Sequence, residues 1–497
     1  MNKIPKFFFW LFLVSLPFGY RLLIFRFTPG FDEYEAIFLY ASDVLMILFL
    51  LNFSAKTFPQ DYRSNPQRGF FAGFRRSLFP TSSENHARSL LEPRFEKKFL
   101  LLFLIFLFIS ILFASYKLLA LYNFIRLVLL VLTALAVAEI LKRNWVKLEN
   151  ILAVLAGLAV FQSLIAFLQF LNQKSLGLWF LGESILGPEI SGVAKIAAAG
   201  GKILRAYGTL PHPNVLAAFL LLGLFCSYYC FLKVLNRKRS FWLKFSGIAA
   251  ISSISLGLVL TFSRTAWFLG LVLTPIFIFY LFRQKHSCQK FNYFSVILIF
   301  IFLILVLGLG YLIFPRAQIY LSEPSVVQRI SYNELGWHLI KTHPLGVGLG
   351  NQVVYSAKNG LYGLFGISQV WQWQPIHNIY LLIGSEIGIL GLLVFLFLLA
   401  KLLISNYKFL ISNKTSISNE KNFGNCPDFV EDSRLCRRKL EIGNLTIMLL
   451  VLLLFGLFDH FLWTLQPGRL MLWLVLGIIM GIKTPCRSMD RTQASEA

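Results

Sequence analysis

A histidine directly before a predicted membrane helix is the residue best placed to do chemistry in this chain. His377 and Asn378 precede an apolar segment that carries Glu386, Gly388 and Gly391. A helix that serves only as an anchor needs neither an imidazole nor a carboxylate, and histidine can take up a proton near neutral pH. This segment therefore predicts a functional site at one face of a membrane.

The composition indicates that many such helices position this site. Hydrophobic residues make up 57% of the 497 residues and charged residues only 14%, whereas soluble domains contain about 25% charged residues. Apolar runs of about 18 or more residues predict transmembrane helices. We therefore expect an all-α polytopic membrane protein with about 12 transmembrane helices. Their predicted ranges are 6–27, 36–53, 98–116, 119–141, 150–171, 215–235, 243–261, 263–283, 292–314, 378–404, 441–461 and 468–483.

The basic residues predict the orientation of the chain. With the N-terminus in the cytoplasm, most of the 47 Lys and Arg residues fall in or beside cytoplasmic segments, as the positive-inside rule requires. Because the positive-inside rule explains the net charge of +24, the basic residues need no nucleic-acid partner. We therefore expect membrane lipids as partners and no nucleic acid. Both termini are then cytoplasmic. The two long outer loops are 172–214 and 315–377, and the second of these lies between helices nine and ten.

The same pattern suggests a division of the chain. Residues 1–149 would hold helices one to four with the basic cytoplasmic loop 54–97, residues 150–483 a membrane domain with both outer loops, and residues 484–497 a cytoplasmic tail. The outer loops contain Trp, Tyr, Gly, Pro and isolated Arg or His, a mixture typical of a folded cap over a site. The sequence assigns no role to the cytoplasmic loops 54–97 and 405–440.

Charged residues within the predicted spans lie at a similar depth. Asp43, Arg126 and Arg21 are about seven residues from the outer ends of their spans and Glu386 about eight, which is roughly 10 Å at 1.5 Å per residue. An ionisable group at the bilayer centre costs about 2.5–3.5 kcal/mol, so each needs a partner or a cavity. Asp43 and Arg126 could form a buried structural pair or line an outward-facing pocket. A transport path would instead need polar residues across the whole membrane.

Further polar residues at the predicted outer face suggest a reaction. These are Arg205, His212, Asn214, Arg264, Arg329, Asp459 and His460. Singly, each has an ordinary explanation, such as contact with lipid headgroups or helix capping. Together, the arginines suit phosphate oxygens, and a histidine base can contribute about 10²–10⁴-fold to a rate. Because no carboxylate cluster for Mg²⁺ or Mn²⁺ appears on this side, we expect no metal and no cofactor. The set fits glycosyl transfer from a polyprenyl diphosphate.

Four short blocks occur in a recognisable order. A His-Asn pair at 377–378, nine residues and Gly-x-x-Gly at 388–391 match one ligase signature. The blocks 205–214, 263–264 and 344–351 resemble other recurrent stretches of the same proteins. On these residues the chain resembles the O-antigen ligase and polymerase superfamily of bacterial membrane glycosyltransferases. The similarity covers about residues 150–480.

The resemblance implies roles for individual residues. It implies that His377 is the catalytic base, that Arg205, Arg264 and Arg329 bind the donor diphosphate, and that the donor is a glycan on undecaprenyl diphosphate. The site would face outward from the bacterial cytoplasmic membrane. The supporting residues that we predict are His212, Asn214, Asn378, Glu386, Gly388, Gly391, Asp459 and His460.

The sequence leaves the acceptor open. A ligase would pass the glycan to lipid A core, another lipid or a protein hydroxyl, whereas a polymerase would pass it to another lipid-linked repeat. In either case we expect an inverting, metal-independent transfer. The alternative from a different class is a twelve-span transporter or flippase. The charged residues lie only near the outer ends of the predicted spans, and the sequence shows no inverted repeat. Both observations argue against a transporter.

Overall fold

The computed structural model describes residues 4–27, 33–57, 93–198, 201–235, 241–283, 323–411 and 428–482, most of which are helical. The helices are α1 (Ile4–Ser15), α2 (Ala41–Thr57), α4 (Pro93–Ser110), α5 (Lys117–Lys142), α6 (Leu148–Asn172), α7 (Pro213–Leu235), α8 (Phe241–Leu260), α9 (Arg264–Arg283), α13 (Pro324–Thr342), α14 (Gln352–Lys358), α15 (Leu361–Leu364), α16 (Ile379–Ile411), α17 (Asp428–Phe455), α18 (Phe461–Thr464) and α19 (Gln466–Ile482). The strands are β1 (Arg21–Arg26), β2 (Ala36–Tyr40), β3 (Lys195–Ala198) and β4 (Gly201–Leu204), and short 3-10 turns span Ile111–Phe113, Trp179–Leu181 and Val370–Gln372.

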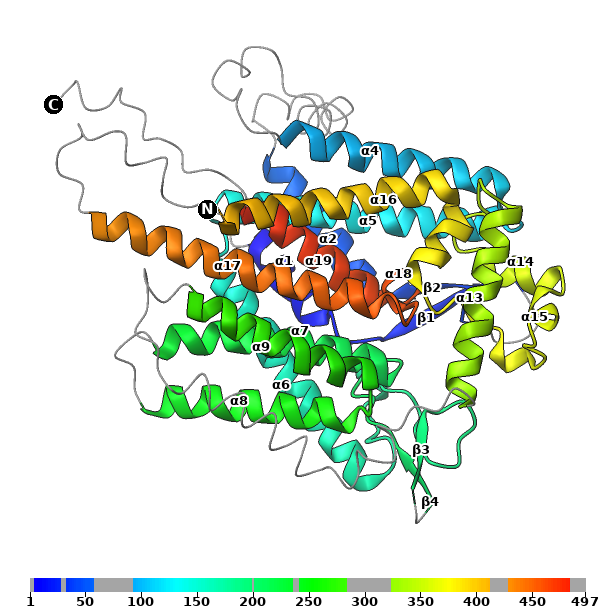
Figure 1. Cartoon of the computed structure of the whole chain (residues 1–497), viewed down its shortest axis with the longest axis horizontal. Coiled ribbons are helices and arrows are strands. Elements are labelled where there is room, and N and C mark those ends of the chain that lie inside the picture. The colour runs from blue at the N-terminus through cyan, green and yellow to red at the C-terminus, as the bar shows by residue number, and fades with distance from the viewer. Residues whose placement is uncertain are drawn as a thin grey trace.

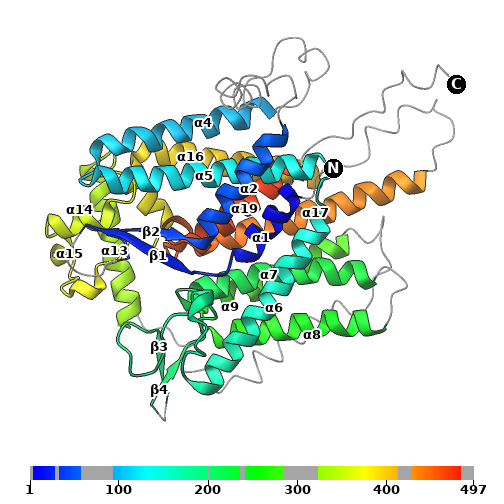
Figure 2. The same cartoon turned by 180° about the vertical axis from the view of Figure 1, so that it is seen from behind.

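Most of the long helices run along the longest axis of the molecule, whereas α6 crosses the bundle at a steep angle (Figures 1 and 2). The helix α13 lies across one end of this bundle, where α14, α15 and both strand pairs also gather (Figure 2). Among the described helices, α5, α6, α7, α8 and α16 are long and apolar enough to cross a membrane, and α1, α2, α4, α9 and α19 are shorter apolar helices. The chain is therefore a mostly helical polytopic membrane protein. The predicted span 292–314 lies outside the described residues, so the number of spans stays a prediction.

The expectation of an all-α chain is wrong at two strand pairs. The predicted first span, 6–27, is helical only to Ser15, and β1 then pairs antiparallel with β2, which replaces the start of the predicted span 36–53. Pro17 ends the first helix, because proline lacks an N–H and disfavours helical geometry in the residue before it. Aromatic and β-branched side chains favour a strand in β2. The second pair, β3 with β4, lies in the outer loop 172–214.

The other predicted loops are described in part. Residues 323–377 of the predicted outer loop 315–377 contain α13, α14 and α15, and α13 packs along α16. Of the predicted cytoplasmic loops 54–97 and 405–440, the structure describes mainly the helix ends: α2 runs to Thr57 and α16 to Ile411. The predicted tail 484–497 lies outside the described residues.

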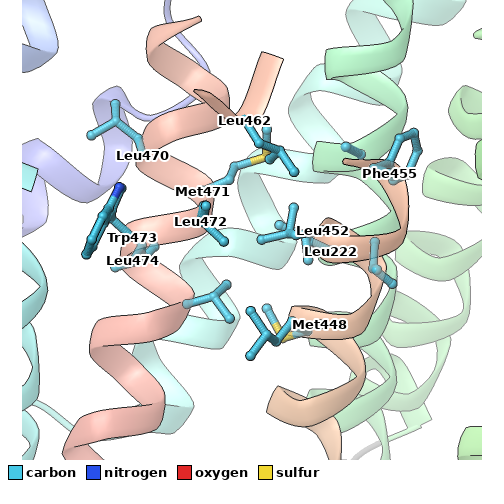
Figure 3. Packing of buried hydrophobic residues seen from close by; sticks show 14 of the residues in the cluster. Leu222, Met448, Leu452, Phe455, Leu462, Leu470, Met471, Leu472, Trp473 and Leu474 are labelled. Atoms are coloured by element: carbon cyan, nitrogen blue, oxygen red, sulfur yellow. The ribbon is translucent and has the colours of Figure 1, made fainter. Parts of the chain in front are cut away.

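The helix α19 forms the centre of the bundle. All of its residues from Gln466 to Ile479 are buried, and it packs against α5, α7, α17 and α18. Figure 3 shows its apolar side chains beside Met448, Leu452 and Phe455 of α17 and Leu222 of α7. A helix that is apolar on every side belongs in a core. The first turn of α19 is thereby held firmly at the end of the bundle that carries α13.

Of the two alternatives for Asp43 and Arg126, the structure shows the buried pair. The Arg126 guanidinium lies 3.7 Å from the Asp43 carboxylate, and both side chains are buried. Gln466 joins them, since its amide donates to Asp43 (2.5 Å) and its carbonyl accepts from Arg126. A buried charge needs such partners in a membrane. This network ties α2, α5 and α19 together, so we interpret the two charges as structural.

Candidate active site

Three neighbours fix the ring of His377, two residues before α16. The ring is stacked on Tyr332 of α13, with centroids 4.7 Å apart and planes 7° apart. His460 meets it edge to face at 4.8 Å, and Nδ1 lies 2.9 Å from the carbonyl oxygen of Pro375. Because a carbonyl can only accept, Nδ1 carries the proton and donates, which leaves the lone pair on Nε2. The ring is thus oriented with Nε2 as its basic atom.

The surroundings of His377 keep it neutral. Burial lowers the pKa of His377 below its ordinary value of 6.5, and His460 and Arg329 lower it further, whereas Asp459 acts in the opposite direction. Burial also lowers the pKa of His460, and it lowers the pKa of His212 to about 3. An imidazole that is neutral at pH 7 can accept a proton.

A chain of hydrogen bonds joins Arg205 to the loop that carries His460. The Arg205 guanidinium donates to the backbone carbonyl of Thr261 (2.7 Å) and to the side-chain carbonyl of Asn214 (2.9 Å). The Asn214 amide donates in turn to Asp459 (2.8 Å), whose other carboxylate oxygen accepts the backbone N–H of His460 (2.8 Å). The predicted residues Arg205, Asn214, Asp459 and His460 therefore form one connected network.

Asp459 supplies a negative charge among the three histidines. Burial raises its pKa, but His460, His377 and His212 and the hydrogen bond from Asn214 lower it by more, so the pKa of Asp459 is held below its usual range. An ionised carboxylate here can stabilise an imidazolium that forms during proton transfer, as the aspartate of a catalytic triad does. His212 itself lies directly before α7, where its Nδ1 accepts the backbone N–H of Asn214 (3.1 Å).

The three predicted diphosphate-binding arginines differ in their contacts. Arg329, on α13, lowers the pKa values of His212, His377 and His460 by its charge. Within the described residues, its Nε is buried and has no hydrogen-bond partner.

Arg264 instead forms an ion pair with Glu323 (2.5 Å), in which each side chain is 20% exposed. Glu323 is the residue directly before α13. The structure therefore brings Arg329 and Arg205 to the histidine cluster and gives Arg264 a carboxylate partner.

Asn378 positions α16 and does not contact the His377 ring through a described hydrogen bond. Its side-chain oxygen accepts the backbone N–H groups of Tyr380 (3.0 Å) and Leu381 (3.2 Å), which is the geometry of a helix N-cap. The backbone N–H of Ile379 also donates to the carbonyl of Gly456 (2.8 Å), just beyond α17. Both interactions fix the point at which the chain enters α16, and hence the place of His377.

The predicted Glu386 organises the loop 344–351. Its carboxylate accepts the indole N–H of Trp463 (2.8 Å) and the backbone N–H groups of Gly350 and Gln352. The carboxylate is buried, and such a group must have hydrogen-bond donors. Glu386 therefore holds the glycine-containing loop and α18 against α16.

A break in α16 at Gly388 receives this loop. Gly388 has φ 79° and ψ 169°, a conformation that is essentially restricted to glycine. The N–H groups of Val347 and Gly348 donate to the carbonyls of Ser385 (2.8 Å) and Glu386 (3.0 Å). A Cβ atom on Gly388 would lie 2.6 Å from the carbonyl oxygen of Pro344. Gly391 is different, because its φ is not positive and an added Cβ would meet the side chain of Ile387.

Sequence reasoning missed Tyr332, which stacks on His377, and Glu323, which pairs with Arg264. A signal for Tyr332 was present, because it lies three residues after Arg329 on one helix, and residues at this spacing share a face. The described part of the chain contains no group of three or more His, Cys, Asp or Glu side chains arranged to hold a metal ion. The predicted independence from metals and cofactors stays a prediction.

Comparison with known proteins gives one family match. Residues 247–396 match the family described as O-antigen ligase. This range contains Arg264, Arg329 and His377, whereas Arg205 and Asp459 lie outside it. A comparison with curated proteins gives no match. Members of the family are membrane ligases and polymerases of lipid-linked glycans in polysaccharide and lipopolysaccharide biosynthesis. The predicted resemblance is thus confirmed over residues 247–396, which match the O-antigen ligase family of membrane enzymes.

Proposed function

We propose that this enzyme transfers a glycan from undecaprenyl diphosphate to an acceptor hydroxyl, with inversion at the anomeric carbon and without a metal. The observation that carries this proposal is the pairing of a neutral imidazole with a positive charge. His377 has its basic Nε2 unengaged by any described hydrogen bond, and Arg329 acts on it electrostatically while its own Nε lacks a partner among the described residues. Such a site suits proton removal next to an anionic leaving group.

The reaction is a single displacement in this proposal. Nε2 of His377 takes the proton of the acceptor hydroxyl as its oxygen bonds to the anomeric carbon. The bond from that carbon to the diphosphate oxygen breaks on the opposite face, and polyprenyl diphosphate leaves with the electron pair. One displacement inverts the configuration. The imidazolium that forms lies near the Asp459 carboxylate, which offsets its charge until the proton passes to water.

The arginines neutralise the leaving diphosphate. Guanidinium groups donate to phosphate oxygens in a fixed fork, so they can supply the positive charge that a metal provides in other enzymes. We assign most of this charge neutralisation to Arg329, with a contribution from Arg205 at the other side of the histidine cluster. Arg264, which we also predict to bind diphosphate, already pairs with Glu323, so we assign it a smaller share. Its pair also holds the start of α13.

The location and acceptor belong to the same proposal. We place the site at the outer face of the bacterial cytoplasmic membrane, with both termini in the cytoplasm, because the basic residues follow the positive-inside rule. The acceptor would be lipid A core, another lipid, a protein hydroxyl or, for a polymerase, another lipid-linked glycan.

The products distinguish the alternatives. The purified protein would be reconstituted in vesicles with a labelled polyprenyl-diphosphate glycan and acceptors extracted from the same cells. We expect release of polyprenyl diphosphate together with a labelled product of larger size. One discrete product would indicate a ligase and a ladder of products a polymerase. Movement of the intact donor across the bilayer without release of diphosphate would contradict glycosyl transfer and support a flippase.

A further inference from the structure

A cavity of about 270 Å³ opens between the β1–β2 strand pair and the turn at Trp179–Leu181. We name it the hairpin cavity. The residues used below are Arg21, Glu33, Trp179, Glu183, Pro211 and Leu465, all of which line it. Small-ligand sites typically measure about 300–1,000 Å³, so this volume suits one small polar unit. Neither the proton transfer nor the diphosphate binding proposed above uses it.

The hairpin cavity adjoins the histidine cluster. Pro211 lines it and is bonded directly to His212. Leu465 also lines it and follows Thr464, whose hydroxyl lies 2.7 Å from Nδ1 of His460. The ring of Tyr34, next to Glu33, meets the ring of His460 at 5.7 Å. A molecule that reacts at the histidine cluster could therefore extend one of its units into this cavity.

The lining argues for a neutral, hydroxyl-rich ligand. Trp179 presents an aromatic surface that is 69% exposed, and Arg21 and Glu33 form an ion pair in which each side chain is 26% exposed. Aromatic faces cover the apolar face of a sugar ring, while planar charged groups bind its hydroxyls. A lipid chain would need an apolar lining. The lining carries two carboxylates, Glu33 and Glu183, against one guanidinium, Arg21, so its net charge is negative and disfavours a phosphate.

We propose that the hairpin cavity binds a sugar residue of the glycan substrate. The inference rests on the proposed glycosyl transfer and adds to it a subsite outside the diphosphate-binding arginines. The sugar is held between Trp179 and the pair of Arg21 and Glu33, with the reacting carbon toward His377. This subsite would contribute to glycan selection, because it contacts the sugar and not the carrier lipid.

Direct binding tests the subsite without any turnover. The probe is the free oligosaccharide, released from the native carrier lipid by mild acid and labelled at its reducing end, titrated into the full chain in detergent. We expect Trp179→Ala to weaken binding by about tenfold, as for a well-placed aromatic contact. Because Trp179 is mostly exposed, this change leaves the packed core intact. Trp242→Ala is the matched control: its side chain is 73% exposed, and it lies at the far end of α8, about 27 Å along that helix from Leu260.

The transfer assay then identifies which substrate contributes the sugar. A raised KM for the donor in Trp179→Ala, with kcat unchanged, assigns the subsite to the donor glycan, and a raised KM for the acceptor assigns it to an acceptor glycan. Equal oligosaccharide binding by the wild type, Trp179→Ala and Trp242→Ala, or no binding by any of them, would overturn the subsite. Failure of transfer in the wild type would instead remove the proposed function, while loss of oligosaccharide binding in Trp179→Ala would still support a sugar site.

Discussion

Replacement of Arg329 by glutamine should lower the rate of diphosphate release strongly. Removing one donor to a developing negative charge typically costs about 2.7–4 kcal/mol, or about 10²–10³-fold in kcat. We expect a value in this range because the Nε of Arg329 is buried without a partner among the described residues. This Nε–H is therefore available to an incoming diphosphate, and no described carboxylate forms an ion pair with Arg329.

Replacement of Arg264 by glutamine should cost much less. Its guanidinium pairs with Glu323, and both side chains are partly exposed. Pairs of this kind contribute about 0.2–1 kcal/mol, so we expect the rate of diphosphate release to fall by at most about fivefold. The double variant Arg264→Gln with Glu323→Gln should behave like Arg264→Gln alone, because each change removes the same pair.

The assay is the initial rate of polyprenyl diphosphate release at saturating donor, with equal amounts of monodisperse protein. Arg329→Gln should also move the acid limb of the pH profile upward, because the charge of Arg329 lowers the pKa of His377. A loss in Arg264→Gln as large as that in Arg329→Gln would refute this assignment of the arginines. So would an unchanged acid limb in Arg329→Gln.

Three further predictions concern pH, backbone and metals. Because burial and neighbouring charges lower the pKa of His377, the base form should persist below pH 6.5 and kcat/KM should fall only at more acidic pH; an acid limb above 6.5 would contradict this. Gly388→Ala should destabilise the protein by about 1–3 kcal/mol or more, because Gly388 has a positive φ and an added Cβ would contact Pro344. Gly391→Ala should lower the stability less. Thermal unfolding in detergent measures both variants, and an equal loss of stability in the two would contradict the role given to the break in α16. EDTA should leave the transfer rate unchanged if arginines supply the positive charge, whereas a rate restored only by added divalent cations would require a metal.

Much of the candidate site could be predicted from the sequence, because its residues lie at the ends of strongly apolar segments. Long apolar runs identify helices, and their ends must lie at a membrane face. His212, His377 and His460 each lie beside such an end, so one face was expected to collect them. The hydrogen-bond chain from Arg205 through Asn214 to Asp459 confirms that these ends converge.

Other features depend on tertiary contacts, which the length of an apolar segment does not predict. The stretch 6–27 is apolar enough to span a membrane, yet β1 forms there because β2 offers it a pairing partner. The ion pair of Arg264 with Glu323 joins residues 59 positions apart, and no local pattern marks it. The break at Gly388 requires the loop 344–351 to donate hydrogen bonds to α16. The glycines were visible in the sequence, but their partners were not.

The most direct test of the proposed mechanism compares the wild type with His377→Ala in the release of polyprenyl diphosphate from a labelled donor. Both proteins would be reconstituted at equal amounts and checked for the same unfolding temperature. We predict that the wild type releases diphosphate and transfers the glycan, and that His377→Ala loses at least about 10²-fold of this rate, the contribution of a general base. A wild-type rate in His377→Ala would contradict the role of His377 as the catalytic base.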